Sequence, residues 1–339
     1  MSGHALYFTA PGEVTLQEMP VTSPAPGELV VETSVSGISA GSELLVYRGE
    51  APSGMIADET IDTLDGDLSF PLRYGYAAVG DVVEVGDDLE EAWLDQTVFA
   101  FAPHGTHFSE RPSNVVRIPD DVSPAAATLL PSVETATNFA LDGAPRIGER
   151  VVVFGAGVIG LCTTHLLSAF PLAELVVVDP IPERRALAEQ FGSDVAIEPD
   201  RIDATIDDWT GDGADLVYEL SGDPETLDAA VAAAGYDGRV VVGSWYGTKR
   251  AALDLGGQFH RDRISIESSQ VSTIAPELRG RWDTDRRLQT AMAHLRELPV
   301  EELISRRIPF SDAPRAYRLL DDDAEHLLQV LLTYSSTHD

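Results

Sequence analysis

Residues Val151 to Asp179 read VVVFGAGVIGLCTTHLLSAFPLAELVVVD, and the interpretation of the whole chain starts from this stretch. A short apolar, β-branched run leads into the glycine pattern of residues 155–160, GAGVIG. A segment with helical periodicity follows, and then a second apolar run that Asp179 closes. Because the glycine pattern lies between a strand and a helix and an acid follows the next strand, it indicates a dinucleotide-binding unit.

Each part of the glycine pattern has its own physical task. Gly155 permits the tight turn, Gly157 lets the backbone approach a pyrophosphate, and Gly160 lets helix and strand pack closely. The amino end of the helix, at Val158 and Ile159, faces the phosphates, because its N–H groups and its dipole favour anions. The alternative is a glycine-rich turn in an unrelated α/β domain.

The acid after the second strand bears on the choice of cofactor. Asp179 lies nineteen residues after Gly160 and is placed to accept hydrogen bonds from a ribose 2′-hydroxyl. A 2′-phosphate beside this carboxylate would meet like-charge repulsion, which only Arg184 or Arg185 could soften. The sequence therefore predicts NAD and leaves NADP open. Arg184 itself lies along the adenosine ribose or merely on a helix face.

The charge of the chain is its most unusual global property. In 339 residues, 56 acids against 23 basic residues give a formal net charge of −33, and Lys249 is the only lysine. The acids are spread along the chain, as in proteins of salt-accumulating microbes, where high salt screens the self-repulsion. This charge argues against nucleic acid or an anionic membrane as a partner. We interpret it as an adaptation to solvent and not as a function.

Other global features restrict the class of protein further. Cys162 is the only cysteine, which excludes intramolecular disulfides and metal sites built from several thiolates. No apolar run approaches the length of a membrane span, and the first residues lack the charged and apolar regions of a secretory signal. We therefore expect a cytoplasmic protein whose partner is a small-molecule substrate.

The patterns along the chain predict an α/β protein of two domains. Residues 1–133 carry short β-rich runs between Pro/Gly turns, which is typical of a small barrel. From residue 151 strands and helices alternate, with helices expected over 156–170 and 224–235 among others, which predicts a doubly wound parallel sheet. The tail reads strand, helix, strand and returns to the first domain. The predicted domains are 1–133 with 285–339, and 134–284.

Several motifs occur in a characteristic order along the chain: GISAGSE at 37–43, GYAAVGDVVEVG at 75–86, the GAGVIG turn, the block FHR to SSQV at 259–271, and ISRRIPFSDAPRAY at 304–317. Through these motifs the chain resembles the medium-chain dehydrogenase/reductase superfamily over nearly its whole length. Within that superfamily, it is most similar to the branch of bacteriochlorophyllide dehydrogenase-like proteins. It implies a GroES-like catalytic barrel, a Rossmann nucleotide-binding domain and an NAD(P)-dependent oxidoreductase.

The zinc ligands of the superfamily are missing from this chain. The first cysteine ligand falls near Ala40, with Ser39 as the only alternative, and the histidine ligand falls on Tyr76. The third ligand position falls near Ser132, with Glu134 two residues on. A catalytic zinc requires three protein ligands of nitrogen, sulfur or carboxylate type. We therefore expect no metal in this enzyme.

Without zinc, a hydrogen-bond donor must stabilise the developing alkoxide. Ser42 occupies the position of the hydroxyl that relays a proton in the family and is the first candidate, with a structural role as the alternative. Tyr76, in place of the zinc-binding histidine, either polarises a carbonyl or fills the vacated metal space. Glu43 matches the acid that supports the metal in the family, and either orients Ser42 or pairs with an arginine.

Further candidates lie outside this motif. His104 is a candidate general acid, and the alternative is an ordinary loop residue without a catalytic role. Its spacing to His107 only weakly suggests a metal site. Glu134 is a candidate base if it is buried, and otherwise a solvent-facing helical residue. Ser221 and Gly222 end a strand and should contact ribose. Ser244 begins the loop that borders the nicotinamide in the family.

The predicted activity is zinc-independent interconversion of a secondary alcohol and its carbonyl by hydride transfer. One alternative is a zinc-free quinone or enone reductase of the same superfamily. The other is a nucleotide-binding protein that has lost its catalysis. The resemblance also implies a homodimer joined through the strand near residues 264–269. The sequence does not identify the substrate.

Overall fold

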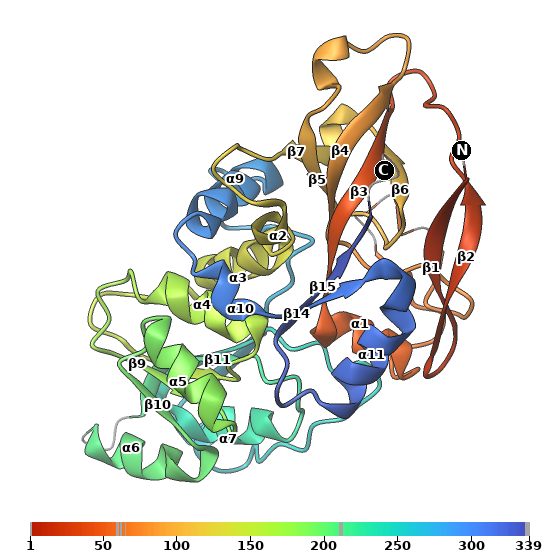
Figure 1. The fold of residues 1–339 in the computed structure, drawn as a ribbon. Coiled ribbons are helices and arrows are strands. Elements are labelled where there is room, and N and C mark those ends of the chain that lie inside the picture. Colours follow the sequence, from red (N-terminus) through yellow and green to blue (C-terminus); the bar gives the residue numbers. More distant parts are fainter. Residues whose placement is uncertain (1, 59–60, 62, 65, 210–212, 336–339) are drawn as a thin grey trace. The chain divides into compact units, whose positions relative to one another are not determined.

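The computed structural model describes residues 2–58, 61, 63–64, 66–209 and 213–335, and the chain divides into two compact units (Figure 1). Unit 1 comprises Met1–Pro131 and Val300–Asp339, and unit 2 comprises Ser132–Pro299. The boundary expected at 285 differs from the boundary at 300 by one helix, α9 (Thr284–Leu295), whose Arg287 binds residues of unit 2. The assignment of the units as catalytic and nucleotide-binding domains stays a prediction.

Unit 1 is built on a mixed sheet in the order β14-β15-β3-β4-β5-β7, with β6 also paired to β3 and with β1 and β2 forming a separate hairpin. Its strands are β1 (Ser2–Ala10), β2 (Glu13–Pro20), β3 (Leu29–Ile38), β4 (Ala78–Val85), β5 (Thr97–Ala100), β6 (His107–Glu110), β7 (Val115–Arg117), β14 (Ile304–Pro309) and β15 (Gln329–Thr333). Its helices are α1 (Ala40–Tyr47), η1 (Glu91–Trp93), η2 (Pro112–Asn114), α2 (Pro124–Ala127), α10 (Val300–Leu303), η4 (Phe310–Asp312) and α11 (Ala313–Asp322).

Strand β3 is the centre of unit 1. It pairs antiparallel with β15, β4 and β6, so most of its residues are buried. Leu29 and Val31, two residues apart on one face, pack with Ala78, Val82 and Val98 from neighbouring strands. This is the alternation that a strand requires to direct one face into a core.

Unit 2 is built on a parallel sheet in the order β10-β9-β8-β11-β12-β13. Its strands are β8 (Arg150–Phe154), β9 (Glu174–Val178), β10 (Val195–Ile197), β11 (Ala214–Glu219), β12 (Ala234–Val242) and β13 (Ser265–Ser268). Its helices are α4 (Val158–Leu167), α5 (Pro182–Gln190), η3 (Pro199–Arg201), α6 (Ile202–Asp208), α7 (Thr226–Ala233), α8 (Gln258–Arg261) and α9, while α3 (Leu130–Gly143) begins at the end of unit 1.

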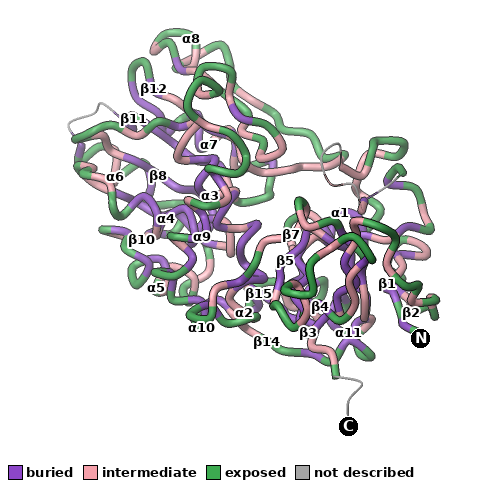
Figure 2. The backbone as a smooth tube through the Cα atoms, turned by 90° about the horizontal axis from the view of Figure 1, so that it is seen from above, coloured by how far each residue is buried: buried purple, intermediate pink, exposed green. Residues whose placement is uncertain are grey.

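The central strands of unit 2 are buried on both faces. Residues 151–154 and 175–178 are all buried, which explains their continuous valine-rich sequences. Helix α4 packs on β8 and β9, α5 on β9 and β10, and α7 on β11 and β12. In Figure 2 the buried residues accordingly follow the strands of the unit, and the surrounding loops are exposed.

The strand order of this sheet reverses between β8 and β11. The chain runs from β8 to β9 and β10 in one direction, and from β11 to β12 and β13 in the other. Ligands of doubly wound sheets bind at the carboxyl ends of the strands at such a point. The glycine turn at Gly155 and the end of β11 at Glu219 both lie there.

The predicted fold class is confirmed, and the differences concern the ends of elements. The helix expected over 156–170 spans Val158–Leu167, because Gly157 is its N-cap. The helix expected over 224–235 ends at Ala233, because β12 already begins to pair with β11 at Ala234. Within the described residues, no helix is long and apolar enough to cross a membrane.

Candidate functional site

Three hydroxyl groups meet in unit 1, those of Ser39 and Tyr76, at two of the expected zinc-ligand positions, and that of Ser42, at the expected relay position. The Tyr76 hydroxyl lies 2.5 Å from Ser39 Oγ and 3.1 Å from Ser42 Oγ. Ser39 is the N-cap residue of α1 and Ser42 lies in its first turn, while Tyr76 lies just before β4. A phenol carries one proton, so one of the two serines donates to Tyr76 and the other accepts from it. We call Ser39, Ser42 and Tyr76 the hydroxyl cluster.

The environment of Tyr76 keeps its proton in place. Burial raises the pKa of the Tyr76 phenol above its usual value, and the charges of Glu43 and Asp58 act in the same direction. The hydrogen bonds with Ser39 and Ser42 oppose this increase in pKa. A phenol with a raised pKa stays a hydrogen-bond donor at neutral pH, which is the form that can stabilise an alkoxide.

A second, fully buried network lies behind the hydroxyl cluster. Glu43 Oε1 accepts the backbone N–H of Ser39 at 2.7 Å, and Glu43 Oε2 accepts from His104 Nε2 at 3.0 Å. The Tyr317 hydroxyl donates to the same oxygen. His104 Nδ1 lies 2.7 Å from Ser36 Oγ, so both ring nitrogens are bound inside unit 1.

These contacts place two of the sequence candidates in supporting positions. Glu43 holds Ser39 through its backbone, and it pairs with a histidine instead of the arginine that the sequence allowed. The side chains of Glu43 and His104 are 0% exposed, so His104 presents no nitrogen to solvent. The geometry favours structural roles for both residues, and the general-acid role of His104 stays an untested prediction.

Gly75 is required for this packing. Its φ angle is +108°, and a Cβ at this position would lie 2.6 Å from His104 Cδ2. Only glycine has both the backbone freedom and the space that this close approach needs. Gly75 therefore leaves room for the His104 imidazole behind the loop. The next residue, Tyr76, stands at the position of the family's histidine and contributes its phenol to the hydroxyl cluster.

The donor set of the hydroxyl cluster does not fit a catalytic zinc. Zinc in proteins takes thiolate, imidazole and carboxylate ligands, whereas the cluster consists of two alcohols and a phenol. His107 lies in β6 with its Nδ1 3.1 Å from Thr106 Oγ1. Among the described residues, no group of three histidine, cysteine, aspartate or glutamate side chains is arranged to hold a metal ion.

In unit 2 the glycine turn packs closely against its neighbours and leaves open space at the start of α4. Gly155 has a φ of +98°, and a Cβ there would lie 2.7 Å from the carbonyl oxygen of Leu220. A Cβ at Gly160 would lie 1.8 Å from the oxygen of Gly155. At Gly157, by contrast, a Cβ would meet no heavy atom of the described chain within 4 Å. Packing therefore requires glycine at 155 and 160, while Gly157 leaves open space at the start of α4.

Asp179 links the end of β9 to this turn. Its Oδ2 accepts the N–H of Ala156 at 2.8 Å and its Oδ1 accepts the N–H of Ile181 at 2.9 Å, and the residue is 3% exposed. A carboxylate oxygen can accept a second hydrogen bond, so the ribose contact predicted from the sequence stays compatible with this geometry. Arg185 Nη1 binds the backbone oxygens of Asp179 and Pro180 at 2.8 and 2.9 Å. Arg184 lies on α5 and is half-buried.

The remaining cofactor candidates, Ser221, Gly222 and Ser244, lie around Glu219, for which no role was predicted from the sequence. Glu219 ends β11, is 0% exposed, and accepts the backbone N–H of Ser221 at 2.8 Å. The hydroxyls of Ser221 and Tyr246 also donate to its carboxylate. Gly222 N–H donates to Ser244 Oγ at 2.9 Å. An acid at the end of an apolar strand, directly before Leu-Ser-Gly, is the signal that could have revealed Glu219.

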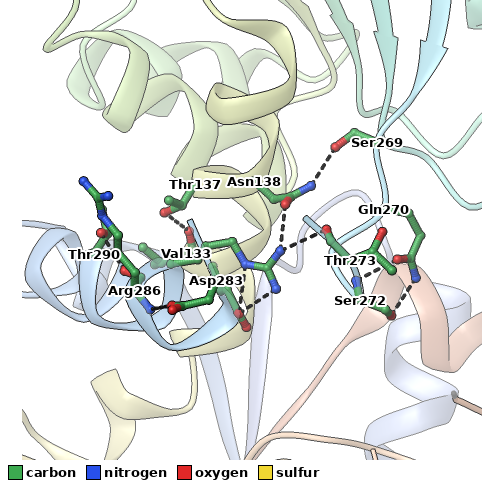
Figure 3. A network of polar contacts seen from close by, with 12 residues as sticks. Val133, Thr137, Asn138, Ser269, Gln270, Ser272, Thr273, Asp283, Arg286 and Thr290 are labelled. Atoms are coloured by element: carbon green, nitrogen blue, oxygen red, sulfur yellow. Dashed lines mark hydrogen bonds and ion pairs between the residues drawn. The ribbon is translucent and has the colours of Figure 1, made fainter. Parts of the chain in front are cut away.

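Glu134 is buried, but its carboxylate is occupied. Arg287 donates to Glu134 Oε1 from Nε at 3.1 Å and from Nη2 at 3.0 Å, and to Asn138 Oδ1 from Nη1 at 2.7 Å. Figure 3 shows this network, in which Asn138 continues to Ser269. Burial raises the pKa of the Glu134 carboxyl, and Arg287 opposes that increase. The pair joins α3 to α9, and the base role of Glu134 stays a prediction.

Comparison with known proteins supports one family. The family model described as zinc-binding dehydrogenase matches residues 158–287. The chain is 24% identical over 347 residues to D-guloside 3-dehydrogenase of Escherichia coli K12, covering 97% of this chain and 99% of that protein. It is 27% identical over 349 residues to 2-desacetyl-2-hydroxyethyl bacteriochlorophyllide A dehydrogenase of Cereibacter sphaeroides, covering 96% and 97%. These similarities support the medium-chain dehydrogenase/reductase superfamily that the sequence motifs indicate.

A solved structure supports the fold. An alcohol dehydrogenase from Escherichia coli CFT073, complexed with NADH, superposes with a TM-score of 0.78 at 22% identity, covering 98% of this chain and 99% of that chain. The chain is thus an NAD(P)-dependent alcohol oxidoreductase, and the enzyme class expected from the sequence is confirmed.

Proposed function

We propose that this oxidoreductase interconverts a secondary alcohol and its carbonyl without a catalytic metal, and that it prefers NAD(H). The observation that carries the proposal is the hydroxyl cluster, in which Ser39 and Tyr76, at two of the expected zinc-ligand positions, offer hydroxyl groups beside Ser42. Bound nicotinamide supplies or accepts the hydride, and the alcohol loses one hydride and one proton when it becomes a carbonyl. The residues of unit 1 must therefore handle the proton.

Tyr76 is the proposed donor to the substrate oxygen. Its phenol keeps its proton at neutral pH because burial raises its pKa, and the substrate oxygen would take the place of the serine that accepts this proton in the free enzyme. Ser42 is the proposed relay, since its Oγ is within hydrogen-bond distance of the phenol. Glu43 and His104 are proposed as positioning residues that hold the start of α1.

The cofactor residues are proposed from unit 2. The start of α4 and the open space at Gly157 would hold the diphosphate, and Asp179 would bind the ribose. Arg184, Ser221, Gly222 and Ser244 are the proposed neighbours of the adenosine and nicotinamide ribose groups. The preference for NAD(H) rests on the charge of Asp179, which a 2′-phosphate would have to approach.

Metal analysis combined with an activity panel tests the proposal. The protein, purified without chelators in molar salt, is assayed for zinc content and then with NADH and NADPH against carbonyls and enones. We expect far less than one zinc per chain and NADH oxidation with ketones. Stoichiometric zinc, with activity that is lost on chelation and restored by zinc, would overturn the metal-free mechanism. Turnover of enones alone would favour the quinone-reductase alternative.

We also propose that the enzyme is a homodimer joined through β13. This strand is the last in the order of its sheet, and pairing with a second copy would extend the sheet. Light scattering after gel filtration should give twice the chain mass of 36.4 kDa. A monomer mass at micromolar concentration would contradict this proposal.

A further inference from the structure

Unit 1 contains a cavity that does not include the hydroxyl cluster. Its volume is about 290 Å³, and it lies between the ends of the β1–β2 hairpin and the segment from Pro103 to Ser109. This volume is at the lower end of the range for small-molecule sites and corresponds to roughly ten water molecules. The polar residues in its wall include Thr22, Thr63, Arg73, Thr106 and His107.

Arg73 has an unusual environment in this wall. Its Nε is buried and has no hydrogen-bond partner among the described residues. Burial lowers the pKa of the guanidinium, yet an arginine starts from such a high value that it stays charged at neutral pH. The residue as a whole is partly exposed, but a partly buried cation without a counter-ion is still costly, so native proteins normally pair such a charge. Within the part of the chain that the structure describes, no carboxylate forms an ion pair with Arg73.

The composition of the cavity wall also favours an anionic ligand. The whole chain has 56 acids in 339 residues, yet none of the described residues that line the cavity is an aspartate or a glutamate. Burial lowers the pKa of His107, so this imidazole is neutral at neutral pH, although Glu32 and Glu84 act on it from outside the cavity wall. Arg73 is therefore the permanent charge among the described wall residues, and it is positive in a strongly negative protein.

We propose that this cavity binds the oxyanion group, a carboxylate or a phosphate, of a small molecule, and that Arg73 is its ion-pair partner. The planar guanidinium matches two oxygens of such a group, and the hydroxyl of Thr22 in the same wall can donate a further hydrogen bond. The site is separate from the dehydrogenase chemistry and does not rest on the proposed function. A bound oxyanion would provide the counter-charge that the described residues do not supply.

The test compares anion binding by the wild-type chain and by Arg73→Gln at constant ionic strength, set with potassium chloride. Inorganic phosphate, acetate and succinate are titrated separately, and binding is followed by calorimetry and by the thermal unfolding midpoint. Arg48→Gln serves as the matched control, since Arg48 is a partly exposed arginine of unit 1 that already pairs with Asp321. We expect saturable binding of at least one probe by the wild type and by Arg48→Gln, with at least tenfold weaker binding by Arg73→Gln. The probe that binds identifies the oxyanion as carboxylate or phosphate.

Two results would overturn the proposal: no saturable binding of any probe by the wild type, or equal binding by Arg73→Gln. If Arg73→Gln does not fold, the wild type decides the question by nitrogen-15 NMR of the arginine Nε–H groups. One such resonance must then shift saturably with the bound probe. If none shifts, the assignment of Arg73 is wrong.

Discussion

At the scale of single residues, Tyr76 carries the central claim about catalysis. Tyr76→Phe removes the phenol hydroxyl and leaves the ring, so kcat should fall by about 10²–10³-fold while the dissociation constant of NADH stays unchanged. Tyr74→Phe is the matched control, because Tyr74 is a buried neighbour whose ring packs edge-on 6.1 Å from Tyr76. Steady-state kinetics and fluorescence titration with NADH measure the two effects. A Tyr76→Phe variant with wild-type kcat would exclude the phenol as the donor.

The titration of Tyr76 predicts the alkaline limb of the pH profile. Because burial raises its pKa, the protonated donor persists to higher pH than the value of about 10 for a free phenol. The rate constant kcat for carbonyl reduction should therefore not decline from this group below that pH, and should decline only above it. A limb that falls near pH 8 and persists in Tyr76→Phe would assign the titration to another group.

Asp179 decides between the two cofactors in the proposed site. Asp179→Asn removes the charge and keeps the size, so the ratio of kcat/KM for NADH to that for NADPH should fall by about tenfold or more. Glu183→Gln removes the same charge four residues further on, in the first turn of α5, and should leave this ratio within about twofold. An unchanged ratio in Asp179→Asn would show that the carboxylate does not sense the 2′ position.

At the scale of elements, the pair of Glu134 and Arg287 joins α3 to α9. The two side chains are 8% and 3% exposed, so Glu134→Ala would leave a buried, unpaired guanidinium and should destabilise the protein by about 3–5 kcal/mol. Arg307 and Glu301 form an exposed pair, and Glu301→Ala should cost about 0–1 kcal/mol. Denaturant unfolding in molar salt measures both losses. Equal small losses would show that the buried pair does not stabilise unit 2.

At the scale of the whole molecule, charge should make stability depend on salt. The net charge of −33 creates self-repulsion that weakens as the screening length falls from about 10 Å at 0.1 M to about 3 Å at 1 M. We predict that the thermal unfolding midpoint rises steadily with potassium chloride over this range. Chloride is preferred to sulfate because sulfate also strengthens apolar burial. A midpoint that does not change with salt would argue against adaptation to a saline solvent.

The sequence was most informative where structure depends on neighbours along the chain. Val151–Phe154, the glycine turn and Leu175–Val178 predicted two parallel strands around a helix, because side-chain periodicity and glycine conformations are local properties. The ends of helices were predicted less accurately, because the end of α7 depends on the pairing of Ala234 with Ala214, twenty residues earlier in the chain.

The functional clusters were visible only in part. Ser42 and Tyr76 were selected through the resemblance to a known family, but their contact joins residues separated by 34 positions. His104 and Tyr317 reach Glu43 across 61 and 274 positions, so no local pattern could indicate that one carboxylate holds both. Arg73 resembles an ordinary surface residue in the sequence and becomes notable only because its Nε is buried without a hydrogen-bond partner among the described residues.

By itself, the sequence determined the order of strands and helices and the glycine turn between them, since these follow from residue type and local spacing. The absence of zinc-type ligands was predicted through the resemblance to a known family. The tertiary structure decided which polar groups meet, namely those of the hydroxyl cluster and of the Glu43–His104 network. It also formed the cavity beside Arg73. The physical reason is that burial and hydrogen bonding are set by residues that are distant along the chain and meet only after the strands have paired.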